Sequence, residues 1–137
     1  MNPITIILKT IVNPTEDISK VKIAIENLIY NPQSKIVSKN NEKIIVARAK
    51  NRDDLKKIYD LFNQQRIRNV ARMVMKKGLQ ERGIIFYVNK QAAYMKRISF
   101  CVAVAESPLG PIRIEITCTD PKGLINWLSP SKVSRKK

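Results

Sequence analysis

Residues 112 to 118 read Ile-Arg-Ile-Glu-Ile-Thr-Cys, so that branched apolar and polar side chains alternate along the run. Successive side chains of a β-strand point to opposite faces, which gives this segment one apolar face and one polar face. A strand of this kind belongs in an antiparallel sheet that is buried on one side and wet on the other. The rest of the chain therefore has to cover the apolar side.

Apolar residues at helical spacing predict the helices that cover this apolar face. An amphipathic helix is expected over residues 16–29, with Thr15 as its cap, and a second helix begins at the cap Asn51. The apolar positions of the second helix rotate after Gln64, so that either one helix bends there or two helices meet. We favour one long bent helix that reaches about Lys77. A short C-terminal helix follows Asp120.

β-Branched and alternating runs supply the strands, and residues 89–97 are expected to be a plain connection. Strands are predicted over residues 4–12, 35–38, 43–49, 84–88, 98–105 and 112–118. This mixture predicts a single α+β domain over residues 1–130, with a largely antiparallel sheet, two main helices on one face and a short C-terminal helix. Residues 131–137 are expected to form a basic flexible tail.

Positive charge is concentrated in the middle of the sequence. The whole chain has a net charge of +15, and residues 48–97 contain fourteen Lys and Arg against four Asp and Glu, a net charge of +10. Mutational drift toward lysine would spread the charge more evenly, and this block also contains seven arginines. A block of this kind favours a polyanionic partner, of which nucleic acid is the commonest.

The sequence gives little support for a catalytic site, a metal site or a membrane-spanning segment. The chain has no His, and its only cysteines, Cys101 and Cys118, lie in apolar runs without metal-site spacing, which favours two buried thiols over a disulfide. We therefore expect no enzyme activity, no cofactor and no metal. Without a long apolar run or a signal peptide, the chain is expected in the cytoplasm, with no membrane partner.

The candidate nucleic-acid contacts are basic and amide side chains of the second helix and of the connection after it. They would contact phosphates, with Gln91 as the best candidate for a directional hydrogen bond. Aromatic side chains are few; Phe62, Phe100 and Trp127 are assigned to the core and Tyr94 is the best stacking candidate. Structured or double-stranded RNA therefore fits better than sequence-specific readout. The candidates are Arg66, Arg68, Arg72, Lys76, Lys77, Lys90, Gln91, Lys96 and Arg97.

Several short sequence motifs, in their order along the chain, resemble those of an uncharacterised archaeal protein family described as RNA-binding and exosome-subunit-like. The most specific of them is Asn-Lys-Gln-Ala-Ala at residues 89–93, and the resemblance extends over roughly residues 4–130. It implies a compact α+β fold similar to that of the ribosomal protein that binds 5S RNA, a homodimer, RNA binding and no catalytic residues. The other strings are Pro-Thr-Glu-Asp at 14–17, Gln-Arg-Ile at 65–67, Pro-Leu-Gly at 108–110 and Leu-Ile-Asn-Trp-Leu-Ser-Pro at 124–130.

Several alternatives stay open at this point. The partner could be DNA, since phosphate contacts do not distinguish it from RNA. The chain could instead be a protein-interaction subunit of an RNA-processing assembly, or a protein with no role in nucleic-acid binding. An unrecognised enzyme site would require a pocket that combines Asp53, Asp54 or Glu81 with a buried lysine.

Overall fold

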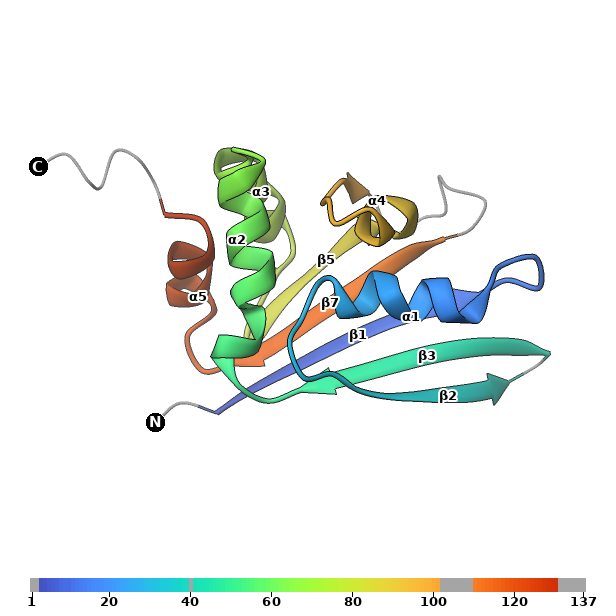
Figure 1. Cartoon of the computed structure of the whole chain (residues 1–137). Coiled ribbons are helices and arrows are strands. Elements are labelled where there is room, and N and C mark those ends of the chain that lie inside the picture. Colours follow the sequence, from blue (N-terminus) through green and yellow to red (C-terminus); the bar gives the residue numbers. More distant parts are fainter. Residues whose placement is uncertain (1–2, 40, 102–109, 131–137) are drawn as a thin grey trace, which may run out of the picture.

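The structure is a computed structural model, and it describes residues 3–39, 41–101 and 110–130. One seven-stranded antiparallel sheet has the strand order β2-β3-β1-β7-β5-β4, with β6 beside β5. Figure 1 shows the helices gathered on one face of this sheet. The prediction of a single α+β domain with a largely antiparallel sheet is confirmed.

The strands agree closely with the alternating runs of the sequence, except for the predicted strand over residues 98–105. Within the described residues, that segment forms only the two-residue strand β6, and residues 102–105 lie outside the described part of the chain. The strands are β1 (Ile4–Val12), β2 (Gln33–Lys39), β3 (Glu42–Ala49), β4 (Leu79–Gln80), β5 (Gly83–Asn89), β6 (Phe100–Cys101) and β7 (Pro111–Cys118).

The helices differ more from the expectation. The single bent helix was wrong, because Arg66 adopts a left-handed conformation (φ 59°) that ends one helix before the next begins. The connection over residues 89–97 also contains a short helix. The helices are α1 (Ile18–Glu26), the 3-10 helix η1 (Arg52–Leu55), α2 (Lys56–Gln64), α3 (Arg68–Lys77), α4 (Lys90–Tyr94) and α5 (Pro121–Leu128).

The first helix begins later than predicted, and Asp17 caps it instead of Thr15. The Asp17 carboxylate accepts hydrogen bonds from the Ser19 hydroxyl (2.6 Å) and the Ser19 amide (2.9 Å). These bonds favour the charged carboxylate and lower the pKa of Asp17 below its usual value. The aspartate thus satisfies a backbone donor that the helix itself leaves without a partner.

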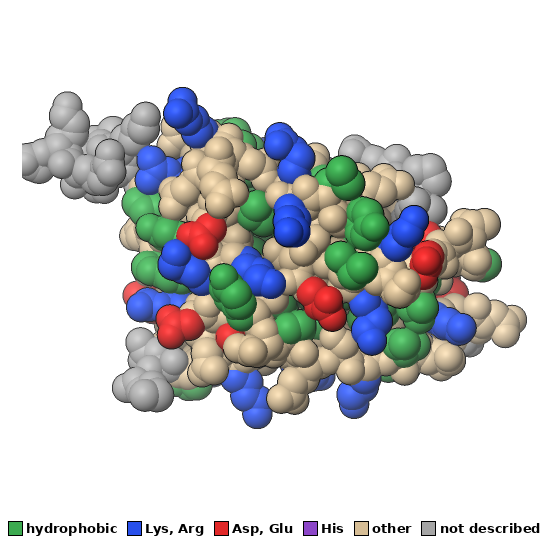
Figure 2. All heavy atoms as spheres, viewed as in Figure 1, with side chains coloured by type: hydrophobic (Ala, Val, Ile, Leu, Met, Phe, Trp, Pro, Cys, Tyr) green, Lys and Arg blue, Asp and Glu red, His purple; other side chains and the backbone are tan. Residues whose placement is uncertain are grey.

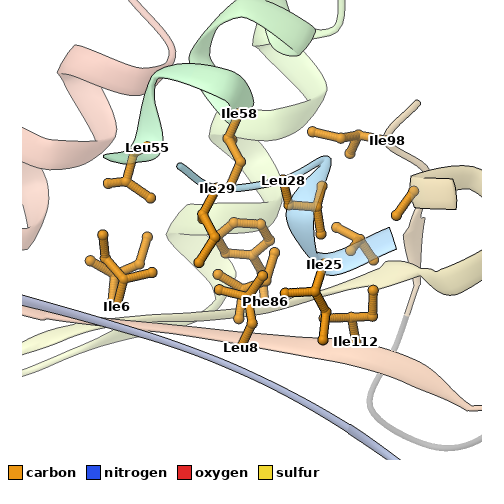
Figure 3. Close-up of a cluster of buried hydrophobic side chains, with 14 of the residues drawn as sticks. Ile6, Leu8, Ile25, Leu28, Ile29, Leu55, Ile58, Phe86, Ile98 and Ile112 are labelled. Atoms are coloured by element: carbon orange, nitrogen blue, oxygen red, sulfur yellow. The ribbon is translucent and has the colours of Figure 1, made fainter. Parts of the chain in front are cut away.

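The core lies between the helices and the apolar face of the sheet. Ile112, Ile114 and Ile116 are fully buried, as the alternation of β7 predicts. Figure 3 shows the side chains of Ile6, Leu8 and Phe86 from the sheet facing those of Ile25, Leu28, Ile29, Leu55 and Ile58 from the helical side. Burial of this apolar layer is the main favourable term in the stability of such a domain.

No described helix covers the opposite face of the sheet, which mixes apolar and charged side chains. One row across the strands joins Arg48, Ile7 and Glu115, and the next row joins Val46, Lys9 and Arg113. Arg113 and Glu115 form an ion pair (2.8 Å) along their own strand. Part of the basic charge of the chain therefore lies on the side away from the helices.

Candidate nucleic-acid interface

A reciprocal pair of hydrogen bonds joins the α2–α3 turn to the segment that follows α4. The Gln65 side-chain amide donates to the Ile98 carbonyl (3.0 Å), and the Ile98 amide donates to the Gln65 side-chain oxygen (2.7 Å). Ile98 is itself buried in the core. We call this pair the Gln65–Ile98 clasp; it holds two segments together that lie 33 residues apart in the sequence.

An exposed basic residue with left-handed backbone lies close to each end of the clasp. Arg66 (φ 59°) follows Gln65 directly, and Lys96 (φ 61°) lies two residues before Ile98. Among the described residues, the other non-glycine positions with positive φ are asparagines, which tolerate this conformation far better. Strained backbone of this kind persists only where the surrounding structure holds it, and it is concentrated at functional sites.

The turn between α2 and α3 also encloses a small pocket. It has a volume of about 300 Å³ and is lined by Asn63, Arg66, Arg68 and Asn69. Two guanidinium groups and two amides supply many hydrogen-bond donors and two positive charges. An anionic oxygen is the kind of group that such a lining attracts.

These two segments together define what we call the hairpin-tip surface. It consists of Asn63, Arg66, Arg68 and Asn69 from the α2–α3 turn, with Lys96 and Arg97 from the segment after α4. Four of the nine residues proposed from the sequence belong to it, namely Arg66, Arg68, Lys96 and Arg97. Asn63 and Asn69 were missed, because an asparagine beside a helix end has no signal in sequence that separates it from a turn residue.

The Asn-Lys-Gln-Ala-Ala string mainly serves the fold. The Asn89 side chain caps α4 by accepting a hydrogen bond from the Ala92 amide (2.8 Å). The Asn27 amide donates to the carbonyls of Ala93 (3.0 Å) and Tyr94 (3.1 Å), which ties α1 to α4. Within this string only Gln91 is exposed to solvent.

Lys90 was predicted as an RNA contact, and its position rules this out. Only 4% of its side chain is exposed, and its ammonium donates to the Glu16 carboxylate (2.9 Å) and the Ile11 carbonyl (2.7 Å). A phosphate cannot reach an ammonium that is buried and already paired inside the protein. Lys90 therefore leaves the set of candidate RNA contacts.

The other basic residues of α3 lie apart from the hairpin tip. Arg72 is half-buried, and its guanidinium donates to the Ser129 carbonyl (2.9 Å) and the Asn126 side chain (2.6 Å), so that it anchors α5 to α3. Lys76 and Lys77 are exposed in the last turn of α3, where a positive charge interacts favourably with the helix dipole. The predicted contacts do not form one continuous set.

The basic charge of residues 48–97 is distributed over several surfaces. In the view of Figure 2, Lys and Arg side chains are spread over the visible surface, with carboxylates and apolar side chains between them. Arg48 lies on the opposite face of the sheet, and Lys56 pairs with Asp60 (2.8 Å). The charges of this block therefore do not form a single electropositive surface, because its helices and strands direct them to different sides of the molecule.

Of the three aromatic residues assigned to the core, Phe62 is fully buried, and Phe100 and Trp127 are partly buried and pack against the core. The Trp127 ring stacks on that of Tyr59 (centroids 5.2 Å apart), and the guanidinium carbon of Arg52 lies over it, 4.8 Å from the ring centroid. Tyr94, the sequence candidate for stacking, is 38% exposed, with the Lys20 ammonium 5.9 Å from its ring centroid. Sequence reasoning missed Tyr59 and Arg52 as partners of the tryptophan.

The arrangement of carboxylates does not match the enzyme site considered above. Asp53 and Asp54 do line a common groove, but the buried lysine, Lys90, is paired with Glu16 instead. Asp54 is buried and accepts hydrogen bonds from the Asn51 backbone (3.3 Å) and the Asn31 side chain (3.3 Å). Among the described residues, no three His, Cys, Asp or Glu side chains gather as a metal site would require.

The structure also bears on the cysteines and on membrane insertion. Cys101 and Cys118 are half-buried thiols, and they do not form the disulfide considered as the less favoured alternative. No helix in the described ranges has the length and apolar character needed to cross a membrane.

The sequence of this chain is similar to those of a described family and of several archaeal proteins. The model of a family described as RNA binding matches residues 5–118. A UPF0201 protein of Pyrococcus horikoshii is 42% identical over 119 residues, which cover 87% of this chain and 84% of that protein. A UPF0201 protein of Sulfurisphaera tokodaii is 40% identical over 125 residues, covering 91% and 86% respectively.

Solved structures extend the similarity to three dimensions. The crystal structure of a UPF0201 protein from Methanococcus jannaschii matches with a TM-score of 0.83 at 30% identity, covering 93% of this chain and 94% of that one. A DUF54 protein from Archaeglobus fulgidus, 18% identical with a TM-score of 0.65, shares the fold. This chain therefore belongs to the family described as RNA binding and is a relative of the archaeal UPF0201 proteins.

Proposed function

We propose that this protein binds structured RNA through the hairpin-tip surface, by contacts to the sugar-phosphate backbone. The observation that carries the proposal is the Gln65–Ile98 clasp, which brings two basic segments together. Each segment contributes one strained basic residue, Arg66 or Lys96, and one further arginine, Arg68 or Arg97. The family to which the chain belongs, described as RNA binding, supports the same ligand.

The chemistry of these groups suits phosphates better than bases. Arginine offers a rigid fork of donors that matches phosphate oxygens, and each phosphate contact releases counterions that were condensed on the nucleic acid. Backbone contacts orient a protein on a duplex without reading its sequence. The asparagine amides, together with Gln91 on α4, supply groups that distinguish RNA from DNA by bonding to the 2′-hydroxyl.

Fluorescence anisotropy with a labelled RNA duplex tests the proposal. Four phosphate contacts predict that log K falls against log salt concentration with a slope of about −3. The double variant Arg66→Ala/Arg97→Ala should bind at least tenfold more weakly. Lys35→Ala/Lys39→Ala on the exposed strand β2 removes the same charge elsewhere and should leave the affinity within about twofold.

Two outcomes would refute this mechanism. One is tight binding that does not respond to salt; the other is an equal loss of affinity in both double variants, which would mean that charge alone matters. A DNA duplex of matched sequence that binds as tightly as the RNA would refute recognition of the 2′-hydroxyl. No catalytic step is part of the proposal.

A homodimer and association with an RNA-processing complex, both considered from the sequence, stay predictions. The face of the sheet that no described helix covers is the candidate surface for contact with a second copy. Light scattering after size-exclusion chromatography measures the mass in solution directly. Co-purification of an acidic protein without nucleic acid would favour the alternative of a protein-interaction subunit.

A further inference from the structure

Two contacts meet at Trp127 on the helical side of the molecule, one with the ring of Tyr59 and one with the guanidinium of Arg52. Tyr59 lies on α2 and Trp127 on α5, with their rings inclined by 27°. Arg52, the first residue of η1, lies over the face of Trp127 and is exposed to solvent. A guanidinium held over an aromatic ring is a flat, positively charged platform on which a further ring can stack.

Arg52 also lines a wide groove of the protein, which we call the end groove. It has a volume of about 850 Å³ and lies where β1 begins and where β3 and β7 end. Volumes of this order hold small organic ligands. Besides Arg52, its polar lining includes Lys50, Asn51, Asp53, Asp54, Thr119 and Asp120.

We propose that the end groove takes one unpaired nucleotide of the bound RNA, with its base stacked on Arg52. This inference rests on the proposed function, since it names a second element of the same ligand. The base would lie on the solvent side of the Arg52 guanidinium, which itself lies over the Trp127 ring. Bases of single-stranded RNA are commonly held on aromatic rings and on arginine planes in this way.

The polar lining of the groove suits the rest of a nucleotide. Lys50, Asn51, Asp53 and Thr119 are all exposed within it. The Lys50 ammonium is suited to a phosphate, and the amide, carboxylate and hydroxyl groups offer donors and acceptors to base edges and to the ribose. Asp54 is excluded from this role, because its carboxylate already accepts hydrogen bonds inside the protein.

The groove and the hairpin-tip surface lie at opposite ends of α2. This helix has nine residues, so about 14 Å separates its ends at 1.5 Å per residue. Figure 1 shows α2 rising from the end of the sheet where β3 finishes toward the turn into α3. An RNA whose paired region rests on the hairpin tip can therefore place a nearby unpaired nucleotide in the groove.

Trp127 makes the inference directly measurable, because it is the only tryptophan of the chain. The experiment titrates the 137-residue chain with three RNA hairpins: one fully paired, one with a single bulged nucleotide, and one with an abasic residue at the bulge. Anisotropy of a label on the RNA reports binding, and Trp127 fluorescence reports stacking beside Arg52. The bulged hairpin should bind about tenfold more tightly than the abasic one and should alone quench Trp127 strongly.

Variants then test the platform itself. Arg52→Ala, and also Arg52→Lys, which keeps the charge but not the plane, should abolish the affinity difference between the bulged and abasic hairpins. Lys43→Ala, at an exposed position of β3, should keep that difference. Wild-type quenching is measured independently of the variants, so a variant that fails to fold does not weaken the test.

The readouts separate this inference from the proposed function. Equal affinity and equal quenching for the bulged and abasic hairpins would overturn the nucleotide site, while salt-dependent binding of the fully paired hairpin would leave the hairpin-tip proposal intact. Quenching by the bulged hairpin that persists unchanged in Arg66→Ala/Arg97→Ala would support the groove and count against the hairpin tip.

Discussion

The ammonium of Lys90 lies 2.9 Å from the carboxylate of Glu16, and the two side chains are only 4% and 11% exposed. The same carboxylate oxygen accepts hydrogen bonds from the backbone and the side chain of Asn13 (2.9 and 3.2 Å). This pair joins the start of α4 to the segment between β1 and α1. It therefore orients α4, from which the chain continues to Lys96 and Arg97 of the hairpin-tip surface.

Replacing Lys90 by Met should lower the free energy of unfolding by about 3 kcal/mol or more, because Glu16 is left as a buried charge without its cation. Urea denaturation measures this change. Lys96→Met at the exposed end of the same segment is the matched control and should change stability by less than about 0.5 kcal/mol. A loss below about 1 kcal/mol for Lys90→Met would contradict the burial of the pair, and Lys90→Met/Glu16→Gln should recover part of the stability.

Replacing Gln65 by Leu removes both hydrogen bonds of the clasp. We expect a loss of about 1–3 kcal/mol in stability, since the Ile98 backbone groups lose their partner. The affinity for an RNA duplex should also fall, although no charge has changed, because Arg66 and Arg97 are no longer held together. Gln64→Leu, at the exposed neighbouring position, should leave the affinity unchanged; equal affinities for the two variants would contradict the role of the clasp.

Replacing Arg66 by Gly distinguishes the effect of backbone strain at this position on stability from the role of the side chain in RNA binding. Glycine accepts the left-handed conformation at no steric cost, so the free energy of unfolding should stay constant or rise by up to about 1 kcal/mol. RNA affinity should fall several-fold in the same variant. Thermal melts and anisotropy titrations on one preparation test both statements, and a destabilised variant would show that the Arg66 side chain supports the fold.

Gly83 is needed where β5 lies against β7. A Cβ atom at this position would collide with the carbonyl of Ile116, which belongs to the backbone and cannot move aside cheaply. Gly83→Ala should therefore lower the free energy of unfolding by about 3 kcal/mol. Gly110→Ala is the control: its Cβ meets open space and only the positive φ (79°) is unfavourable, so about 1 kcal/mol is expected.

Cys118 should react slowly with alkylating reagents. Burial raises the pKa of its thiol above the ordinary value of 9.0, so that the reactive thiolate is scarce near neutral pH. In a Cys101→Ser background, iodoacetamide at pH 8 should modify the folded protein several-fold more slowly than the denatured one. Because the folded state favours the protonated thiol, its contribution to stability is full below pH 9 and is lost as the pH rises through the raised pKa. Fast alkylation at pH 8 would contradict this assignment.

The limits of the sequence show most clearly at Arg66 and Lys90. The apolar positions rotate between α2 and α3, which left one bent helix and two helices as alternatives, and only the left-handed turn at Arg66 decided between them. Lys90 has the sequence features of a surface cation beside a polar string. Its burial depends on Glu16, which lies 74 residues away in the sequence.

Periodicity by itself determined the antiparallel sheet, its buried and wet faces, and the α+β class, because strand and helix patterns depend on residues only a few positions apart. Composition determined the excess of positive charge. Tertiary structure decided which charges reach solvent together, through the Gln65–Ile98 clasp and the stack of Arg52 on Trp127. Those contacts join residues far apart in the chain, and local spacing carries no information about which distant side chains the fold brings into contact.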